Sequence, residues 1–274
     1  MANKQFTICA LFYGKHPDLA ERLLESLGRA GWADYFDMRV GLNNVCRDTE
    51  TVLRRHIYVP ITDVYRGEQP YYKYPLMRRM FHGTPDATLN DGHPGIDTKY
   101  TIWFDDDSWL LDSNRDPQLW FGILDDKMQN HAMVGAPYLM NLRGHQAQYI
   151  RDQPWFNGKP VPQHARISFI TGGWWCIRTD ILKRHDWPPK DFEHNGGDVM
   201  LGALCHQHGY KMGKFTTGLA INANESGKCS TASRRGFSQQ PIGVTYRCEP
   251  PEAPAPRIRN HPTLFDVLDG KHVP

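Results

Sequence analysis

Residues 99–112 read Lys-Tyr-Thr-Ile-Trp-Phe-Asp-Asp-Asp-Ser-Trp-Leu-Leu-Asp, and this stretch decides the fold prediction. Tyr100 to Phe104 is apolar, β-branched or aromatic, which is typical of a buried strand. The strand ends abruptly in three carboxylates, at positions 105–107. Carboxylates at the end of a buried strand are costly unless a positive group lies beside them. The sequence therefore predicts either a cation-binding strand end or a solvated acidic turn.

The three carboxylates are expected to separate into two faces. Because successive residues of a strand alternate between faces, Asp105 and Asp107 should point one way and Asp106 the other. Two carboxylates on one face suit a hard divalent cation that also binds phosphate groups. We therefore expect Asp105 and Asp107 to hold Mg²⁺ or Mn²⁺, with Asp107 as the more direct ligand and Asp106 less important.

The segments before the acidic strand alternate between strand and helix patterns. Strands are expected at Phe6–Tyr13 and Tyr35–Val40, and helices at Leu19–Ala30 and Asp48–Ile57. This order predicts an α/β fold with parallel strands. Later elements are expected as helices at Leu76–Phe81 and Pro117–Asn130, a strand at Met133–Met140, a mobile loop at Arg143–Gln163, a short strand at Arg166–Ile170 that resumes at Trp174–Arg178, and helices at Asp180–Arg184 and Gly197–His208.

Length and composition suit one large domain, or one domain with an appendage. The chain has 274 residues and a net charge of +2, so its overall charge favours no class of partner. None of the six cysteines forms a Cys-x-x-Cys pair, which favours reduced thiols in a cytoplasm. Neither a secretory signal nor an apolar run of membrane-spanning length is evident in the sequence. We expect a cytoplasmic protein with no membrane partner, and the sequence leaves its oligomeric state open.

A second motif is Thr-Gly-Gly-Trp-Trp at residues 171–175. Gly172 and Gly173 would let the backbone approach a ligand closely. Trp174 and Trp175 would offer a flat platform for a sugar ring or a base. The alternative is a β-bulge at the glycines with one of the two tryptophans in the core, and the motif alone does not decide between these interpretations.

A third motif is Asn-Gly-Gly-Asp at residues 195–198, at the start of a predicted helix. An aspartate in the first turn of a helix is most often a cap. Asp198 could instead act as a general base, removing the proton of an acceptor hydroxyl as that hydroxyl attacks an anomeric carbon.

These three motifs, in this order, resemble those of the GT-A glycosyltransferases, especially the inverting enzymes of glycosyltransferase family two. The resemblance covers roughly residues 6–215 and includes Gly-Asp-Val-Met-Leu followed by Gly-Tyr at 209–210. It implies a Rossmann-like nucleotide-sugar domain with a mixed, mostly parallel sheet flanked by helices. It also implies that Asp105 and Asp107 bind ribose and metal and that Asp198 is the catalytic base. The 172–175 stretch would contact sugar and acceptor. The chain departs from the family at Gly197, where a glutamate is usual.

The resemblance also suggests how the chain is divided. We expect a GT-A catalytic domain at residues 1–222, with a nucleotide-sugar half at about 1–112 and an acceptor half at about 113–222. Residues 223–274 should form an irregular extension, first basic and then proline-rich, that wraps on the domain. Between residues 210 and 260 there are eight Lys or Arg against three acidic residues. Arg234 and Arg235 are candidates for contacts to the donor diphosphate or to an anionic acceptor; the alternative is a solvated basic loop.

The predicted activity is metal-dependent transfer of a hexosyl or pentosyl group from a nucleoside-diphosphate sugar to an acceptor hydroxyl. The chain resembles small bacteriophage glycosyltransferases, some of which modify hydroxymethylated pyrimidines in phage DNA, and this acceptor would place it in a host cytoplasm. Three alternatives are an enzyme for envelope glycan or polysaccharide precursors, a nucleotide-sugar-binding module without turnover, and a nucleotidyltransferase. The nucleotidyltransferase is disfavoured because residues 14–17, Gly-Lys-His-Pro, form no glycine-rich phosphate loop.

Overall fold

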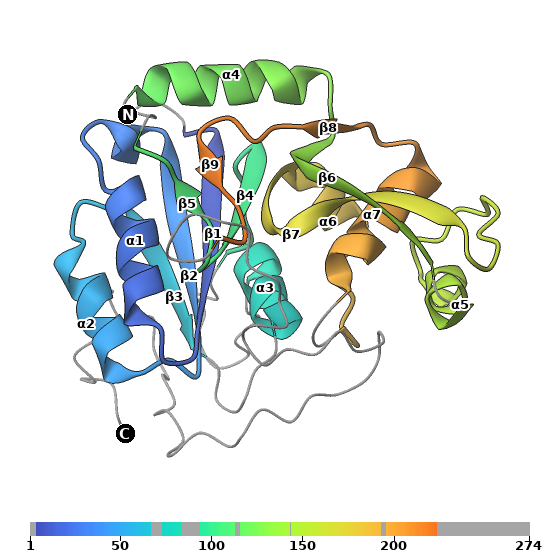
Figure 1. The fold of residues 1–274 in the computed structure, drawn as a ribbon, viewed down its shortest axis with the longest axis horizontal. Coiled ribbons are helices and arrows are strands. Elements are labelled where there is room, and N and C mark those ends of the chain that lie inside the picture. The colour runs from blue at the N-terminus through green and yellow to red at the C-terminus, as the bar shows by residue number, and fades with distance from the viewer. Residues whose placement is uncertain are drawn as a thin grey trace.

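A computed structural model describes residues 4–66, 73–83, 94–112, 116–142, 144–192 and 196–223. In this part of the chain a central sheet has the strand order β3-β2-β1-β4-β7-β6-β8, and helices cover both of its faces (Figure 1). Its strands are β1 (Phe6–Tyr13), β2 (Phe36–Asn43), β3 (Ile61–Arg66), β4 (Tyr100–Asp105), β6 (Met133–Asn141), β7 (Arg166–Arg178) and β8 (Met212–Lys214). The pairs of β1 with β2, β1 with β4, β2 with β3 and β6 with β8 are parallel, and β7 is antiparallel to β4 and β6. This confirms the predicted α/β fold with a mixed, mostly parallel sheet.

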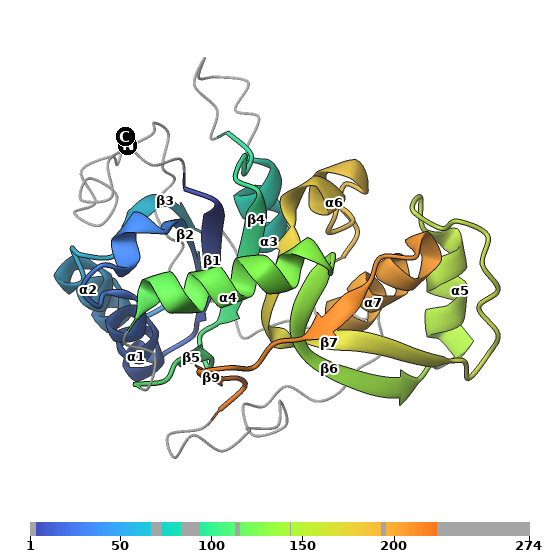
Figure 2. The same ribbon diagram turned by 90° about the horizontal axis from the view of Figure 1, so that it is seen from above.

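Most helices lie close to their predicted positions, but the helix at Gly144–Asp152 was not predicted and the one at Lys73–His82 begins three residues earlier than expected. The helices are α1 (Pro17–Leu27), α2 (Arg47–Arg55), α3 (Lys73–His82), α4 (Pro117–Gln129), α5 (Gly144–Asp152), α6 (Thr179–Arg184) and α7 (Gly197–His208), with a 3-10 turn η1 at Trp32–Asp34. Helix α4 runs across one end of the sheet, at the top of Figure 1 and towards the viewer in Figure 2. Among the described residues, no helix is long and apolar enough to cross a membrane.

Strand β1 is almost entirely apolar because both of its faces are covered. Ile8 and Ala10 belong to a core shared with α1 and α4, whereas Cys9 and Leu11 belong to a second core shared with α3 and α7. A strand buried on both faces reads as a continuous apolar run rather than an alternating one. The sheet thus separates two cores, and the interior strands contribute to both.

The strand order creates a topological switch point beside β1. Chain connections lead from β1 to β2 on one side, whereas β4 lies on the other side of β1. In open α/β sheets, ligands bind outside the carboxyl ends of the strands at such a reversal. The carboxyl ends of β1 and β4 point downward in Figure 1, where α3 and the start of α7 also lie. This edge is where the acidic residues follow β4.

Two predicted segments are wrong. Residues 166–178 form one uninterrupted strand rather than two short ones, so the two glycines lie inside β7. The stretch Arg143–Gln163, predicted as a mobile loop, contains α5, whose residues Gln146, Ala147 and Ile150 are buried. Helix α5 is short and mostly polar, and prolines follow it in the sequence. The polar, proline-broken pattern therefore predicted a loop. A small second sheet pairs β5 (Trp109–Leu110) with β9 (Leu219–Ala220).

The predicted division into a nucleotide-sugar half and an acceptor half stays a prediction. The C-terminal extension beyond residue 223 lies outside the described residues, and so does its predicted wrapping on the domain.

Candidate functional site

Asp105 is the last residue of β4, and its carboxylate is already engaged by two donors. The Lys73 ammonium lies 2.7 Å from Oδ1 and 2.8 Å from Oδ2. The Trp103 indole N–H donates to Oδ1 at 2.8 Å. The positive partner that the acidic strand end required is therefore supplied by the chain itself.

Lys73 was missed by the sequence analysis, which began the corresponding helix at Leu76. It is the first residue of α3, and besides Asp105 it donates to the backbone carbonyl of Gly172 at 3.2 Å. Its ammonium also lies 5.3 Å from the centroid of the Trp103 ring. Lys73 thus joins the end of β4 to the middle of β7.

Asp198 lies in the first turn of α7, on the other side of Lys73. Gly196, with φ of 75°, is the N-cap, so Asp198 is inside the helix rather than at the capping position. Its Oδ1 accepts a hydrogen bond from the Val199 N–H at 2.9 Å. A Cβ added at Gly172 would lie 3.8 Å from Asp198 Oδ2 and 3.5 Å from Lys73 Nζ, so the three residues are neighbours.

Burial is the main influence on the charge of Asp198. It raises the pKa of the Asp198 carboxyl, and the Val199 N–H and the Lys73 ammonium oppose that shift, while the Asp105 charge adds to it. A carboxylate with a raised pKa is a stronger base than an exposed aspartate. Perturbed carboxyl groups in a polar cleft are candidates for acid–base roles.

Tyr74 is a second residue that the sequence did not single out. Its ring takes the space where a side chain at position 197 would lie, since a Cβ added at Gly197 would overlap the Tyr74 ring and hydroxyl. The backbone N–H groups of Gly197 and Asp198 lie close to the Tyr74 hydroxyl and act to lower its pKa. Burial raises the pKa of Tyr74 well above its usual value, so the hydroxyl stays neutral. The glycine at position 197 therefore leaves the space that the Tyr74 ring occupies.

Asp106 and Asp107 lie in the turn that follows β4, and they are 4% and 7% exposed. The prediction that Asp105 and Asp107 share a strand face is wrong, because the strand ends at Asp105 and the alternation of faces ends with it. The turn is fixed to the end of the described chain, since the Ala223 N–H donates to the Asp107 carbonyl at 2.8 Å.

The carboxylates of Asp105 and Asp107 only partly suit a divalent metal. Carboxylate oxygens are suitable ligands for Mg²⁺ or Mn²⁺, and Asp107 offers one carboxylate at the predicted place. Asp105 does not fit, because an ammonium and an indole N–H occupy its oxygens. Among the described residues, no group of three or more His, Cys, Asp or Glu side chains is gathered to hold a metal. Any Mg²⁺ at Asp107 would therefore need its remaining ligands from water or from a bound molecule.

Neither tryptophan of the Gly-Gly-Trp-Trp motif forms a platform for a ligand. Trp174 is 0% exposed and packs in the core with Trp120 and Phe215, and Trp175 is 2% exposed and stacks on Trp103 on the opposite face. Both rings therefore lie in the core, whereas the sequence left a platform open and predicted the burial of only one of them. The physical reason is that β7 is an interior strand with both faces covered, so alternation buries each ring in a different core.

The two glycines do lie at the site. The Gly172 carbonyl accepts a hydrogen bond from the Lys73 ammonium, as described above. A Cβ at Gly173 would overlap the side chain of Asn222, whose Nδ2 donates to Thr171 Oγ1 at 2.9 Å and whose backbone N–H donates to Ser108 Oγ at 3.0 Å. The missing side chain thus lets Asn222 pack against β7 beside the acidic turn. The candidate ligands Arg234 and Arg235 lie outside the described residues.

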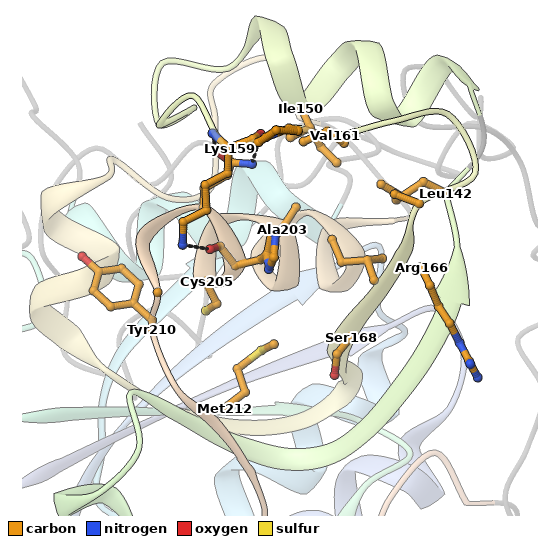
Figure 3. Close-up of a pocket in the computed structure, with 16 residues that line it drawn as sticks. Leu142, Ile150, Lys159, Val161, Arg166, Ser168, Ala203, Cys205, Tyr210 and Met212 are labelled. Atoms are coloured by element: carbon orange, nitrogen blue, oxygen red, sulfur yellow. Dashed lines mark hydrogen bonds between the residues drawn. The ribbon is translucent and has the colours of Figure 1, made fainter.

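A separate pocket of about 290 Å³ lies at the other end of α7 (Figure 3). It is lined by residues of α5, β7, α7 and β8 and of the segments around them, among them Lys159, Arg166 and Tyr210. The cavity beside Asp198, by contrast, is about 10 Å³, which is the space of about one water molecule.

No protein-family model matches the sequence, and no curated protein does. Solved structures with a similar chain path include S. aureus TarS 1–349, at 12% identity and a TM-score of 0.46, over 78% of this chain and 58% of that one. The mannosyltransferase PcManGT from Pyrobaculum calidifontis, in complex with GDP-Man and Mn²⁺, matches at 14% identity and 0.47, over 78% and 55%. Mouse xyloside xylosyltransferase 1 matches at 9% identity and 0.39, over 77% and 84%. This chain therefore spans a little over half the length of the first two.

Proposed function

We propose that the protein is a glycosyltransferase that moves a sugar from a nucleoside-diphosphate sugar to an acceptor hydroxyl. One observation carries the proposal. Asp105 at the end of β4 and Asp198 at the start of α7 converge on Lys73 and Gly172, at the carboxyl edge of the sheet beside its switch point. A nucleotide is expected at this edge, and a partly buried carboxylate with a raised pKa stands next to it.

In the proposed reaction, Asp198 accepts the proton of the acceptor hydroxyl while the hydroxyl oxygen attacks the anomeric carbon of the donor. The bond from that carbon to the diphosphate oxygen breaks, and its electron pair leaves with the nucleoside diphosphate. Attack from the face opposite the leaving group inverts the anomeric centre. Asp105, held by Lys73, faces the donor ribose, and the backbone at Gly172 lies beside the sugar. A divalent cation at Asp107 would neutralise charge on the leaving diphosphate.

The donor part of the proposal is tested by thermal unfolding with nucleoside diphosphates and with Mg²⁺ or Mn²⁺. A ligand that binds only the folded protein raises its melting temperature. We expect a rise with a nucleoside diphosphate plus metal, and the metal-dependent part of that rise should be lost in Asp107→Asn. The absence of a shift with UDP, GDP, CDP, ADP or dTDP would overturn the donor site.

Turnover separates the enzyme from a nucleotide-sugar-binding module. Product masses measured with a panel of nucleotide sugars and candidate acceptors should show the added hexosyl or pentosyl group. Donor binding without any product on DNA, glycan or small-molecule acceptors would favour the binding module.

We further propose the hydroxymethyl group of a modified pyrimidine in DNA as the acceptor. The support is the excess of Lys and Arg over acidic residues between residues 210 and 260, with Arg234-Arg235-Gly236-Phe237 within it. Basic side chains bind phosphates, and an aromatic side chain can stack on a base. Binding to hydroxymethylated DNA should weaken steeply as salt increases and should weaken further in the Arg234→Ala, Arg235→Ala double variant. Salt-independent binding, or transfer only to glycans, would favour an envelope glycan or polysaccharide precursor instead.

A further inference from the structure

Lys73 makes more contacts than a surface ion pair. Its ammonium donates to both oxygens of Asp105 and to the Gly172 carbonyl, and it lies over the Trp103 ring. Its side chain is 14% exposed. These contacts join α3, β4 and β7 at one atom.

A second lysine–aspartate pair shows what an ordinary contact of this kind looks like. Lys4 lies 2.9 Å from Asp37 Oδ1, with side-chain exposures of 27% and 39%. Among the described residues, that ammonium bonds to this single oxygen. Exposed pairs of this kind contribute little to stability. Lys73 differs because it is more buried and bonded to two strands at once.

The placement of Lys73 matters because two carboxylates converge on it. Asp105 and Asp198 carry like charges, and each raises the cost of ionising its neighbour. The ammonium between them offsets that repulsion, and its bond to the Gly172 carbonyl fixes its position relative to β7. Without it, Asp105 would keep only the Trp103 indole among the side-chain donors described above.

We propose that Lys73 is a positioning residue that holds Asp105 and Asp198 at a fixed spacing across the site. This proposal rests on the proposed function, since Asp105 faces the donor and Asp198 the acceptor. Lys73 takes no part in bond making itself. In this role Lys73 aligns the acceptor hydroxyl with the donor sugar, because Asp198 binds the acceptor and Asp105 faces the donor.

The test compares kcat and KM of Lys73→Met, Lys73→Arg and Lys4→Met with those of the wild-type protein. Misplacement of reacting groups by about 1 Å can cost about 100-fold in rate, so we expect kcat of Lys73→Met to fall by about that factor. The KM for the donor should change by less than about threefold, as for an interaction made in the transition state. Lys73→Arg keeps the positive charge and should recover at least about tenfold of the lost kcat, although a guanidinium differs in shape from an ammonium. Lys4→Met should behave as wild type.

The outcomes separate the two proposals. If wild-type protein neither binds nor consumes any nucleotide sugar, the proposed function fails and the positioning role fails with it. If wild-type protein is active and Lys73→Met keeps its kcat, the positioning role alone is overturned. A merely structural role predicts equal losses in Lys73→Met and Lys73→Arg that follow their melting temperatures, and this result would also overturn the proposal.

Discussion

The two ends of helix α7 differ in both the space and the chemistry that they offer. At its start, a cavity of about 10 Å³ adjoins Asp198, Lys73 and Tyr74. At its end, a pocket of about 290 Å³ is lined by apolar side chains and by polar groups, several of which are bonded to one another. There, Gln207 Oε1 accepts from the backbone N–H groups of Asn157 and Lys159, and its Nε2 donates to the Lys159 carbonyl. The larger pocket therefore has the less reactive lining.

This difference shows that cavity size is a poor guide to chemistry in this molecule. The polar atoms at the end of α7 hold a loop in place, and their hydrogen bonds are used for structure. The groups at the start of α7 are charged, come from three separate elements and converge. We therefore assign the chemistry to the start of the helix, and the following variants test that assignment from the largest expected effect to the smallest.

Replacing Asp198 by asparagine should reduce transfer by about 10²- to 10⁴-fold, because the general base is lost. Affinity for the nucleoside diphosphate should be unchanged, since Asp198 lies on the acceptor side. Initial rates and calorimetric donor binding measure the two effects. Asp180→Asn is a matched control, because Asp180 also lies in the first turn of a helix but pairs with surface arginines. Full activity of Asp198→Asn would remove the start of α7 from the mechanism.

Replacing Trp174 by alanine should lower the free energy of unfolding by about 3–5 kcal/mol, because a fully buried ring leaves a cavity. Urea unfolding measures the loss. Tyr138→Ala on the neighbouring strand β6 is the control: that ring is 53% exposed, and its loss should cost about 0.5 kcal/mol or less. A stable Trp174→Ala protein with lost sugar transfer would restore the platform interpretation of the Gly-Gly-Trp-Trp motif.

The stability of Asp198→Asn should depend on pH. The folded-state pKa of Asp198 is raised, so ionising this carboxyl costs folding free energy above that pKa and costs none below its unfolded value of about 3.9. Asp198→Asn should therefore unfold at a higher temperature than wild type near neutral pH. The difference should shrink as the pH falls towards that unfolded value. A variant less stable than wild type at neutral pH would show that the attraction to Lys73 outweighs burial.

The smallest effect is expected at the other end of the helix. Lys159 Nζ donates to the His206 carbonyl at 2.8 Å, in the last turn of α7. A cation at a helix C-terminus contributes about 0.3–1 kcal/mol, so Lys159→Ala should lower the free energy of unfolding by that amount. Sugar transfer should be unchanged. A large loss of transfer with little loss of stability would assign function to the pocket of Figure 3 and reverse the comparison.

The elements that follow local patterns were predictable from the sequence. The run before Asp105 and the apolar run of β1 report burial on both faces, and both strands form where expected. Helix α7 begins at Gly197 and ends at His208, as the flanking glycines indicated. The break predicted inside β7 failed because a pair of glycines often marks a turn, whereas here the missing side chain of Gly173 makes room for Asn222.

The central contact of the site could not be predicted. Lys73 meets Asp105 across 32 positions of sequence and Gly172 across 99, and no periodic pattern links residues so far apart. Alternation correctly places Trp174 and Trp175 on opposite faces of β7. It says nothing about which faces are covered, so their burial in two separate cores depends on the tertiary fold.

The hydrogen bond from Trp103 to Asp105 has an optical consequence. The indole is fully buried and donates to a site carboxylate at 2.8 Å, so its excited-state dipole lies in the electric field of that charge. Any molecule that moves Lys73 or adds charge beside Asp105 will change this field. The emission wavelength of Trp103 should therefore shift when a charged molecule arrives, which would give the protein a built-in fluorescent reporter that needs no label.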